Sequence, residues 1–169
     1  VIPVDETGVL DLDAFVNQLD SQVKLVAVNH VSNAIGTINP IAKIISLAHA
    51  KGAKVLIDGA QSVAHMDIDV QELDMDFFVF SAHKLFGPTG VGILYGKRAL
   101  LDSMPPYQGG GEMIKEVSFS GTTYNELPYK FEAGTPNIAD VIAFGTAIDY
   151  VKSYGSGELM KQEQALLAY

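Results

Sequence analysis

Four short apolar runs recur along the chain, separated by segments in which apolar residues follow helical spacing. Runs of this length, apolar on both faces, are typical of strands buried in the middle of a sheet. We therefore predict strands at residues 23–29, 54–58, 77–81 and 91–95.

The segments between these runs carry the start and stop signals of helices. In residues 40–51, Pro40 opens the first turn, apolar residues follow at i, i+3, i+4 and i+7 spacing, and Gly52 ends the helix. Strands that alternate with helices predict an α/β fold, in which a mostly parallel sheet is covered by helices on both faces. The predicted helices are residues 11–19, 40–51, 98–104, 140–153 and 157–169, with one helical turn at 70–73.

Residues 105–137 interrupt this alternation. The stretch contains Gly109, Gly110 and Gly111 in a row and several aromatic residues without helical period, which predicts loops with a short irregular hairpin. The three glycines fit either a flexible turn or a place where the backbone approaches a ligand or a second subunit closely.

Length and composition limit the class of protein. The chain has 169 residues, of which 48% are hydrophobic, which is enough for one domain with its own core, and we treat residues 1–169 as that domain. It starts at Val1 without a methionine and ends at Tyr169 inside a predicted helix, which suggests a fragment of a longer protein. A net charge of −9 argues against a nucleic-acid partner, and no apolar run reaches membrane-spanning length. The absence of cysteine excludes disulfides and thiolate metal sites, no metal site is predicted, and the cytoplasm is the default location.

The most informative polar residue is Lys84, which stands between an apolar strand and a Gly-Pro turn. Burial at the end of a strand lowers the pKa of a lysine and makes its amine a nucleophile toward carbonyl groups. Upstream, the second predicted strand ends in Asp58, and Gln61 follows. A lysine for a Schiff base and an acid for a pyridine nitrogen are the pair that pyridoxal 5′-phosphate (PLP) requires. Each residue alone fits an ordinary solvated strand end, whereas the ordered pair, with His83 before the lysine, favours a PLP site.

Six short motifs occur in an order that resembles the class V aminotransferase-fold enzymes, which depend on PLP. As a set they look most like a cysteine desulfurase of the SUF type (group II), close kin to selenocysteine lyases. The resemblance implies the type I fold of PLP-dependent transferases, with this chain as the central part of the large domain. The motifs are Ser32-Asn33, Asp58-Gly59-Ala60-Gln61-Ser62, Ser81-Ala82-His83-Lys84, Gly87-Pro88-Thr89-Gly90, Gly109-Gly110-Gly111-Glu112-Met113-Ile114 and Phe131-Glu132-Ala133-Gly134-Thr135-Pro136-Asn137.

The resemblance also implies contacts between individual residues and the cofactor. Lys84 is similar to the catalytic lysine that binds PLP and moves the substrate α-proton. Asp58 is similar to the carboxylate that pairs with the pyridine nitrogen, which keeps the ring an electron sink. Gln61 resembles the residue that bonds the phenolic oxygen, and Ser81 and His83 resemble phosphate contacts.

Two further residues resemble contacts outside this group. Thr135 is similar to a threonine that reaches the PLP phosphate of the partner subunit in a homodimer, and Asn33 to an amide that touches the substrate carboxylate. Structural roles stay open as alternatives: a helix cap for Gln61, a turn for Asn33, and polar strand ends for Ser81 and His83.

Other polar residues show no pattern that indicates chemistry. Several aspartates near the start of the chain are irregularly spaced and do not form a calcium loop. Three histidines have no partner that the sequence identifies, and we interpret them as structural or surface residues: His30, His49 and His65.

The implied function is cysteine desulfuration. L-cysteine, or L-selenocysteine, would be converted to alanine, and the sulfur would pass as a persulfide to an acceptor protein for iron–sulfur cluster assembly. The family places the persulfide cysteine and a carboxylate-binding arginine after this chain, and a histidine that stacks on PLP before it. We therefore expect a parent enzyme with this activity and an inactive isolated fragment. Two alternatives stay open: another class V enzyme (aminotransferase, epimerase or lyase) and a non-catalytic α/β binding module.

Overall fold

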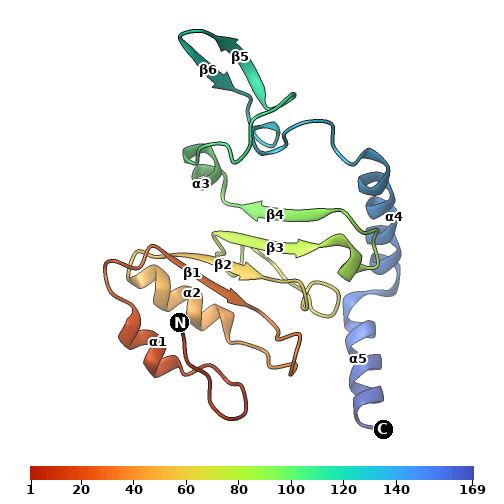
Figure 1. Cartoon of the computed structure of the whole chain (residues 1–169). Helices are drawn as coiled ribbons and strands as arrows, with labels where there is room; N and C mark the ends of the chain where they lie inside the picture. Colours follow the sequence, from red (N-terminus) through yellow and green to blue (C-terminus); the bar gives the residue numbers. More distant parts are fainter.

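A four-stranded sheet forms the centre of the molecule (Figure 1). The computed structural model describes residues 1–169, except for the side chain of residue 156. The strand order is β1-β2-β3-β4; the first three strands are parallel and β4 is antiparallel to β3. All four strands lie within one or two residues of their predicted positions: β1 (Leu25–Asn29), β2 (Lys54–Asp58), β3 (Phe77–Ser81) and β4 (Gly92–Gly96).

The five predicted helices are also confirmed. Local signals set their ends: the Asp11 side chain accepts a hydrogen bond from the Ala14 N–H at 2.9 Å and caps α1, and Gly52 follows α2 with a φ of +78°. Residues 70–73 form the expected hydrogen-bonded turn. The helices are α1 (Leu12–Gln18), α2 (Ile41–Ala50), α3 (Arg98–Ser103), α4 (Ile138–Tyr154) and α5 (Ser156–Leu167), with two 3₁₀ helices, η1 (Ala82–Leu85) and η2 (Tyr129–Phe131).

The main core lies between α2 and one face of the sheet. The apolar stripe of α2 that the sequence predicts is buried there, and alternate strand residues meet it because side chains along a strand point to opposite faces. The buried residues are Ile41, Ile44, Ile45 and Ala48 from α2 and Val26, Val28, Val55, Ile57 and Phe78 from the strands.

The opposite face of the sheet has less cover. Leu25 and Leu94 point to that face, and their exposed fractions are 52% and 50%. The mostly parallel α/β sheet is thus confirmed, while among the described residues the helical layer that buries a core lies on one face. The polar residues Asp58 and Ser81, at the carboxyl ends of β2 and β3, point to this less covered face.

Residues 105–137 contain the predicted irregular hairpin. Strands β5 (Ile114–Ser118) and β6 (Gly121–Tyr124) pair with a register shift and project away from the central sheet (Figure 1). The Gly111 carbonyl accepts hydrogen bonds from the Met113 N–H at 2.8 Å and the Gly134 N–H at 3.0 Å. Among the described residues, the triple glycine therefore approaches another segment of its own chain.

Candidate active site

The carboxyl ends of the parallel strands bring the predicted cofactor residues to one edge of the sheet. Asn29 of β1 pairs with Asp58 of β2, and Asp58 pairs with Val79 of β3. Ser81 follows Val79 by two residues, so Asp58 and Ser81 point to the same face. This is the face turned away from the α2 core.

Asp58 leads into a tight turn that also carries Gln61. The Asp58 Oδ1 accepts a hydrogen bond from the Ala60 N–H at 2.9 Å, and the rest of this carboxylate is exposed. Gly59 is buried, and a Cβ added there would lie 2.0 Å from Cζ of Phe78. Only glycine therefore fits between Asp58 and the core, and Gln61 lies half-buried two residues further on.

Lys84 lies on η1, directly after β3. Ala82 and Leu85 are buried against Phe144 of α4, and because they are three residues apart they fix one side of the 3₁₀ helix. His83 is left exposed and Lys84 half-buried. The core contacts of η1 thus hold Lys84 beside the edge that carries Asp58 and Ser81.

The backbone after η1 is strained. Phe86 ends this helix in the left-handed region, with a φ of +58°, a conformation that costs a non-glycine residue about 1–2 kcal/mol. The Gly87 N–H closes the turn on the Ala82 carbonyl at 2.9 Å, and the Phe86 ring packs edge-on against Tyr150 of α4 at 6.4 Å between centroids. Such strain persists where surrounding contacts over-determine it, and it is typical of functional sites.

Asn33 lies in the loop between β1 and α2. Asn39 is buried and fixes the base of this loop, because its Nδ2 donates to the Asn29 carbonyl at 2.8 Å. His30 is also buried at the base; burial lowers the pKa of its imidazole, and its Nδ1 has no hydrogen-bond partner among the described residues. The exposed Asn33 and the half-buried Gln61 line the same cavity of about 410 Å³.

Thr135 is the predicted site residue that the structure does not bring to this edge. It is exposed and lies between η2 and α4, after Gly134, whose N–H bonds the Gly111 carbonyl. No hydrogen bond or ion pair joins Thr135 to another described residue of the chain.

The polar side chains of the site are uncommitted. Among the described residues, none forms a hydrogen bond or ion pair with the side chains of Gln61, Ser81, His83 or Lys84. These four side chains supply a cation, a hydroxyl, an amide and an imidazole, which can donate hydrogen bonds to the phosphate and phenolic oxygen of PLP. The nearby Asp58 carboxylate can accept one from the ring nitrogen. The residues present therefore fit PLP. The described residues contain no group of three or more His, Cys, Asp or Glu that could hold a metal ion.

The sequence analysis did not identify two polar contacts that the structure shows. His49 bonds the buried Asp76 at 2.7 Å, and His65 contacts Glu163 at 2.5 Å. The partners are 27 and 98 residues apart, so no local spacing signals either contact.

The chain belongs to the aminotransferase class-V family, whose profile matches residues 1–169. Within that family it is similar to cysteine desulfurases: it is 54% identical over 170 residues to one from Escherichia coli O8 (strain IAI1), which covers 100% of this chain and 42% of that protein. The apo structure of a Thermococcus onnurineus NA1 cysteine desulfurase superposes with a TM-score of 0.92 at 40% identity, over 99% of this chain and 42% of the other. The Escherichia coli cysteine desulfurase CsdA superposes with a TM-score of 0.89 at 42% identity, over 93% and 39%.

These comparisons confirm the predicted family and the α/β fold with a mostly parallel sheet. The chain spans less than half the length of the relatives it matches. No described helix is long and apolar enough to cross a lipid bilayer.

Proposed function

We propose that this chain is the central part of a PLP-dependent cysteine desulfurase that converts L-cysteine, or L-selenocysteine, to alanine. The observation that carries the proposal is the edge of the sheet at which the exposed Asp58 carboxylate lies beside Ser81 and Lys84, whose side chains have no hydrogen-bond or ion-pair partner among the described residues, in a chain 54% identical to a cysteine desulfurase. PLP, when bound, supplies the electron sink for substrate chemistry.

In this proposal the residues of the edge have distinct tasks. Lys84 holds the cofactor through Nζ and moves the substrate α-proton, and Asp58 keeps a proton on the ring nitrogen. Gln61 donates to the phenolic oxygen. Ser81 and His83 donate to the phosphate, which favours binding in a chain of net charge −9.

Substrate recognition and assembly are part of the same proposal. Asn33 contacts the substrate carboxylate from the wall of the cavity that it shares with Gln61. Thr135, which has no partner in its own chain among the described residues, contacts the phosphate bound by a second subunit of a homodimer. The persulfide cysteine lies outside this cysteine-free chain, and the sulfur passes to an acceptor protein in the cytoplasm.

The experiment that tests the function uses the full-length protein with PLP. Borohydride reduction and peptide mapping should place the pyridoxyl group on Lys84, and the protein should form alanine from L-cysteine without an added keto acid. Lys84→Ala should abolish both signals. Lys43→Ala, an exposed position on α2, is the matched control and should retain both. A label on Lys54 or Lys97, or no alanine from the wild-type protein, would contradict the proposal.

A further inference from the structure

One wall of the cavity that contains Asn33 and Gln61 is formed by α5, near the carboxyl end of the chain. Four residues of α5 line this cavity of about 410 Å³, and their i, i+3, i+4 and i+7 spacing places them on one side of the helix. They are Met160, Glu163, Gln164 and Leu167.

A side-chain hydrogen bond between His65 and Glu163 joins this wall to the turn that carries Gln61. The Nδ1 of His65 lies 2.5 Å from Oε1 of Glu163. His65 follows Gln61 by four residues, and both line the cavity. Because the His65 N–H bonds the Ser62 carbonyl at 3.0 Å, and the Ser62 N–H bonds the Gly59 carbonyl at 3.0 Å, His65 is fixed relative to Asp58 and its turn.

The other attachments of α5 within this chain are limited. The helix follows Gly155, which has a φ of +74°. Its apolar residues Leu159 and Met160 are half-buried, whereas Leu166 and Leu167 are 65% and 88% exposed. Only part of the apolar surface of α5 is therefore removed from water within this chain, and the contact between His65 and Glu163 adds to what holds this wall in place.

We propose that His65 and Glu163 are positioning residues that hold α5 against the Gln61 turn and so set the width of the substrate pocket. The proposal rests on the proposed function, in which Gln61 contacts the cofactor and Asn33 the substrate. A wider pocket weakens the hold on a small amino acid without moving Lys84 or Asp58, which are fixed by β2 and η1. The expected effect is therefore on KM for L-cysteine and not on kcat.

The size of the effect follows from exposure. The two side chains are 45% and 43% exposed, and pairs with this much solvent contact change an equilibrium by about two- to fivefold. We expect Glu163→Gln and His65→Gln each to raise KM for L-cysteine by about two- to fivefold, with kcat within about twofold of wild type. The double variant should add little to either single variant, because both weaken the same contact.

The test uses the full-length PLP-loaded protein and two measurements: steady-state kinetics with L-cysteine, and amide hydrogen exchange of residues 59–66 and 157–167. Exchange in both segments should be faster in Glu163→Gln and His65→Gln. Glu158→Gln is the matched control, because Glu158 is on the same helix but pairs with Lys161 at 2.7 Å within it; it should change neither measurement.

The two measurements separate this proposal from the proposed function. If amide hydrogen exchange is unchanged in both single variants, the positioning role of His65 and Glu163 is overturned, whether or not the protein acts on cysteine. Faster exchange with an unchanged KM also overturns it, because α5 would then not set the pocket. A wild-type protein that does not act on cysteine rejects the proposed function, and faster exchange in the variants would still support the contact between α5 and the Gln61 turn.

Discussion

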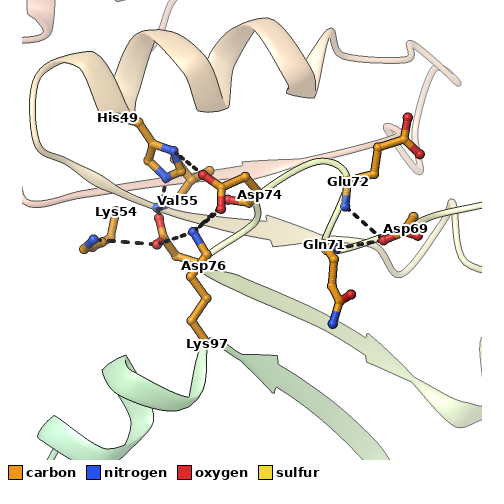
Figure 2. A network of polar contacts seen from close by, with 9 residues as sticks. All are labelled: His49, Lys54, Val55, Asp69, Gln71, Glu72, Asp74, Asp76 and Lys97. Carbon is orange, nitrogen blue, oxygen red and sulfur yellow. Dashed lines mark hydrogen bonds and ion pairs between the residues drawn. The ribbon is translucent and has the colours of Figure 1, made fainter.

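Replacing Asp76 should strongly destabilise the protein, because this buried carboxylate is the centre of a polar network at the amino ends of β2 and β3 (Figure 2). Asp76 is completely buried. Its Oδ2 accepts hydrogen bonds from His49 Nε2 at 2.7 Å and from the Val55 N–H at 2.8 Å. Its Oδ1 lies 3.3 Å from Nζ of Lys97 and 3.7 Å from Nζ of Lys54. One side chain thus connects α2, β2 and the residue that precedes α3.

The magnitude follows from these contacts. Hydrogen bonds to a charged group contribute about 1.5–3 kcal/mol each, and breaking a buried ion pair costs about 3–5 kcal/mol when the remaining charge is left without water. Here the side chains of His49, Lys97 and Lys54 keep 24%, 31% and 49% of their surface exposed and can be rehydrated. We therefore expect about 2 kcal/mol for Asp76→Asn, which keeps an acceptor for Val55, and about 3 kcal/mol for Asp76→Ala.

The assay is urea unfolding of the full-length protein, with Asp74→Asn as control. Asp74 contacts Lys97 at 2.6 Å and His49 at 3.3 Å, but its side chain is 64% exposed, so its loss should lower the free energy of unfolding much less than the loss of Asp76. If Asp76→Asn and Asp74→Asn were equally stable, burial would not decide the strength of this network and the reasoning would be wrong.

The same network predicts a dependence on pH. Burial raises the pKa of the Asp76 carboxyl, but hydrogen bonds from His49, Val55 and Lys97 outweigh burial and hold the pKa below its usual value. The stabilisation is then complete above the unfolded-state pKa of about 3.9 and is lost as pH falls through the lower folded-state pKa. The stability difference between wild type and Asp76→Asn should shrink below about pH 4, and a constant difference would refute this assignment.

Two further predictions concern the residues around the candidate site. Gly59→Ala places a Cβ 2.0 Å from the Phe78 ring and should lower the free energy of unfolding by about 1–3 kcal/mol, whereas Gly145→Ala in α4, which meets nothing within 4 Å, should not; equal urea midpoints would contradict the steric argument. Burial lowers the pKa of His30, so its contribution is present above the unfolded-state value of about 6.5 and is lost as pH falls through the folded-state pKa. In thermal unfolding, the midpoint temperature of His30→Leu should therefore fall less than that of the wild type between about pH 7 and pH 5. Parallel pH profiles of the two proteins would argue against a buried neutral imidazole.

The sequence predicts the strands and helices well because burial imposes a period on the residues that meet the core. The stripe at Ile41, Ile44, Ile45 and Ala48 identifies α2 from its spacing alone, since a helix that packs on a sheet needs apolar residues at these intervals. The direction of β4 has no such signal, because an apolar run reads the same for a parallel and an antiparallel strand.

The sequence predicts which residues of the site stand at strand ends, but not how they lie relative to one another. Asp58 and Lys84 end apolar strands, so the position of each is visible in the sequence, but that Asp58 and Ser81 share a face depends on the pairing of Asp58 with Val79. Contacts between distant segments, such as His65 with Glu163, are set by how the elements pack, and no local pattern encodes them.

The polar side chains at the two ends of the sheet differ in whether they have partners among the described residues. At the amino ends of β2 and β3, the buried Asp76 carboxylate is compensated by the partly exposed His49 and Lys97, and removing these partners would leave Asp76 with an uncompensated desolvation penalty. At the carboxyl ends, the side chains of Ser81, His83 and Lys84 have no hydrogen-bond or ion-pair partner among the described residues, and each keeps some contact with water. A sheet stabilised by its core and its amino-end network can leave donors at the other end free for an anionic ligand. Substitutions at the two ends should therefore differ in kind: those around Asp76 lower the free energy of unfolding, and those around Lys84 lower cofactor affinity at nearly constant stability.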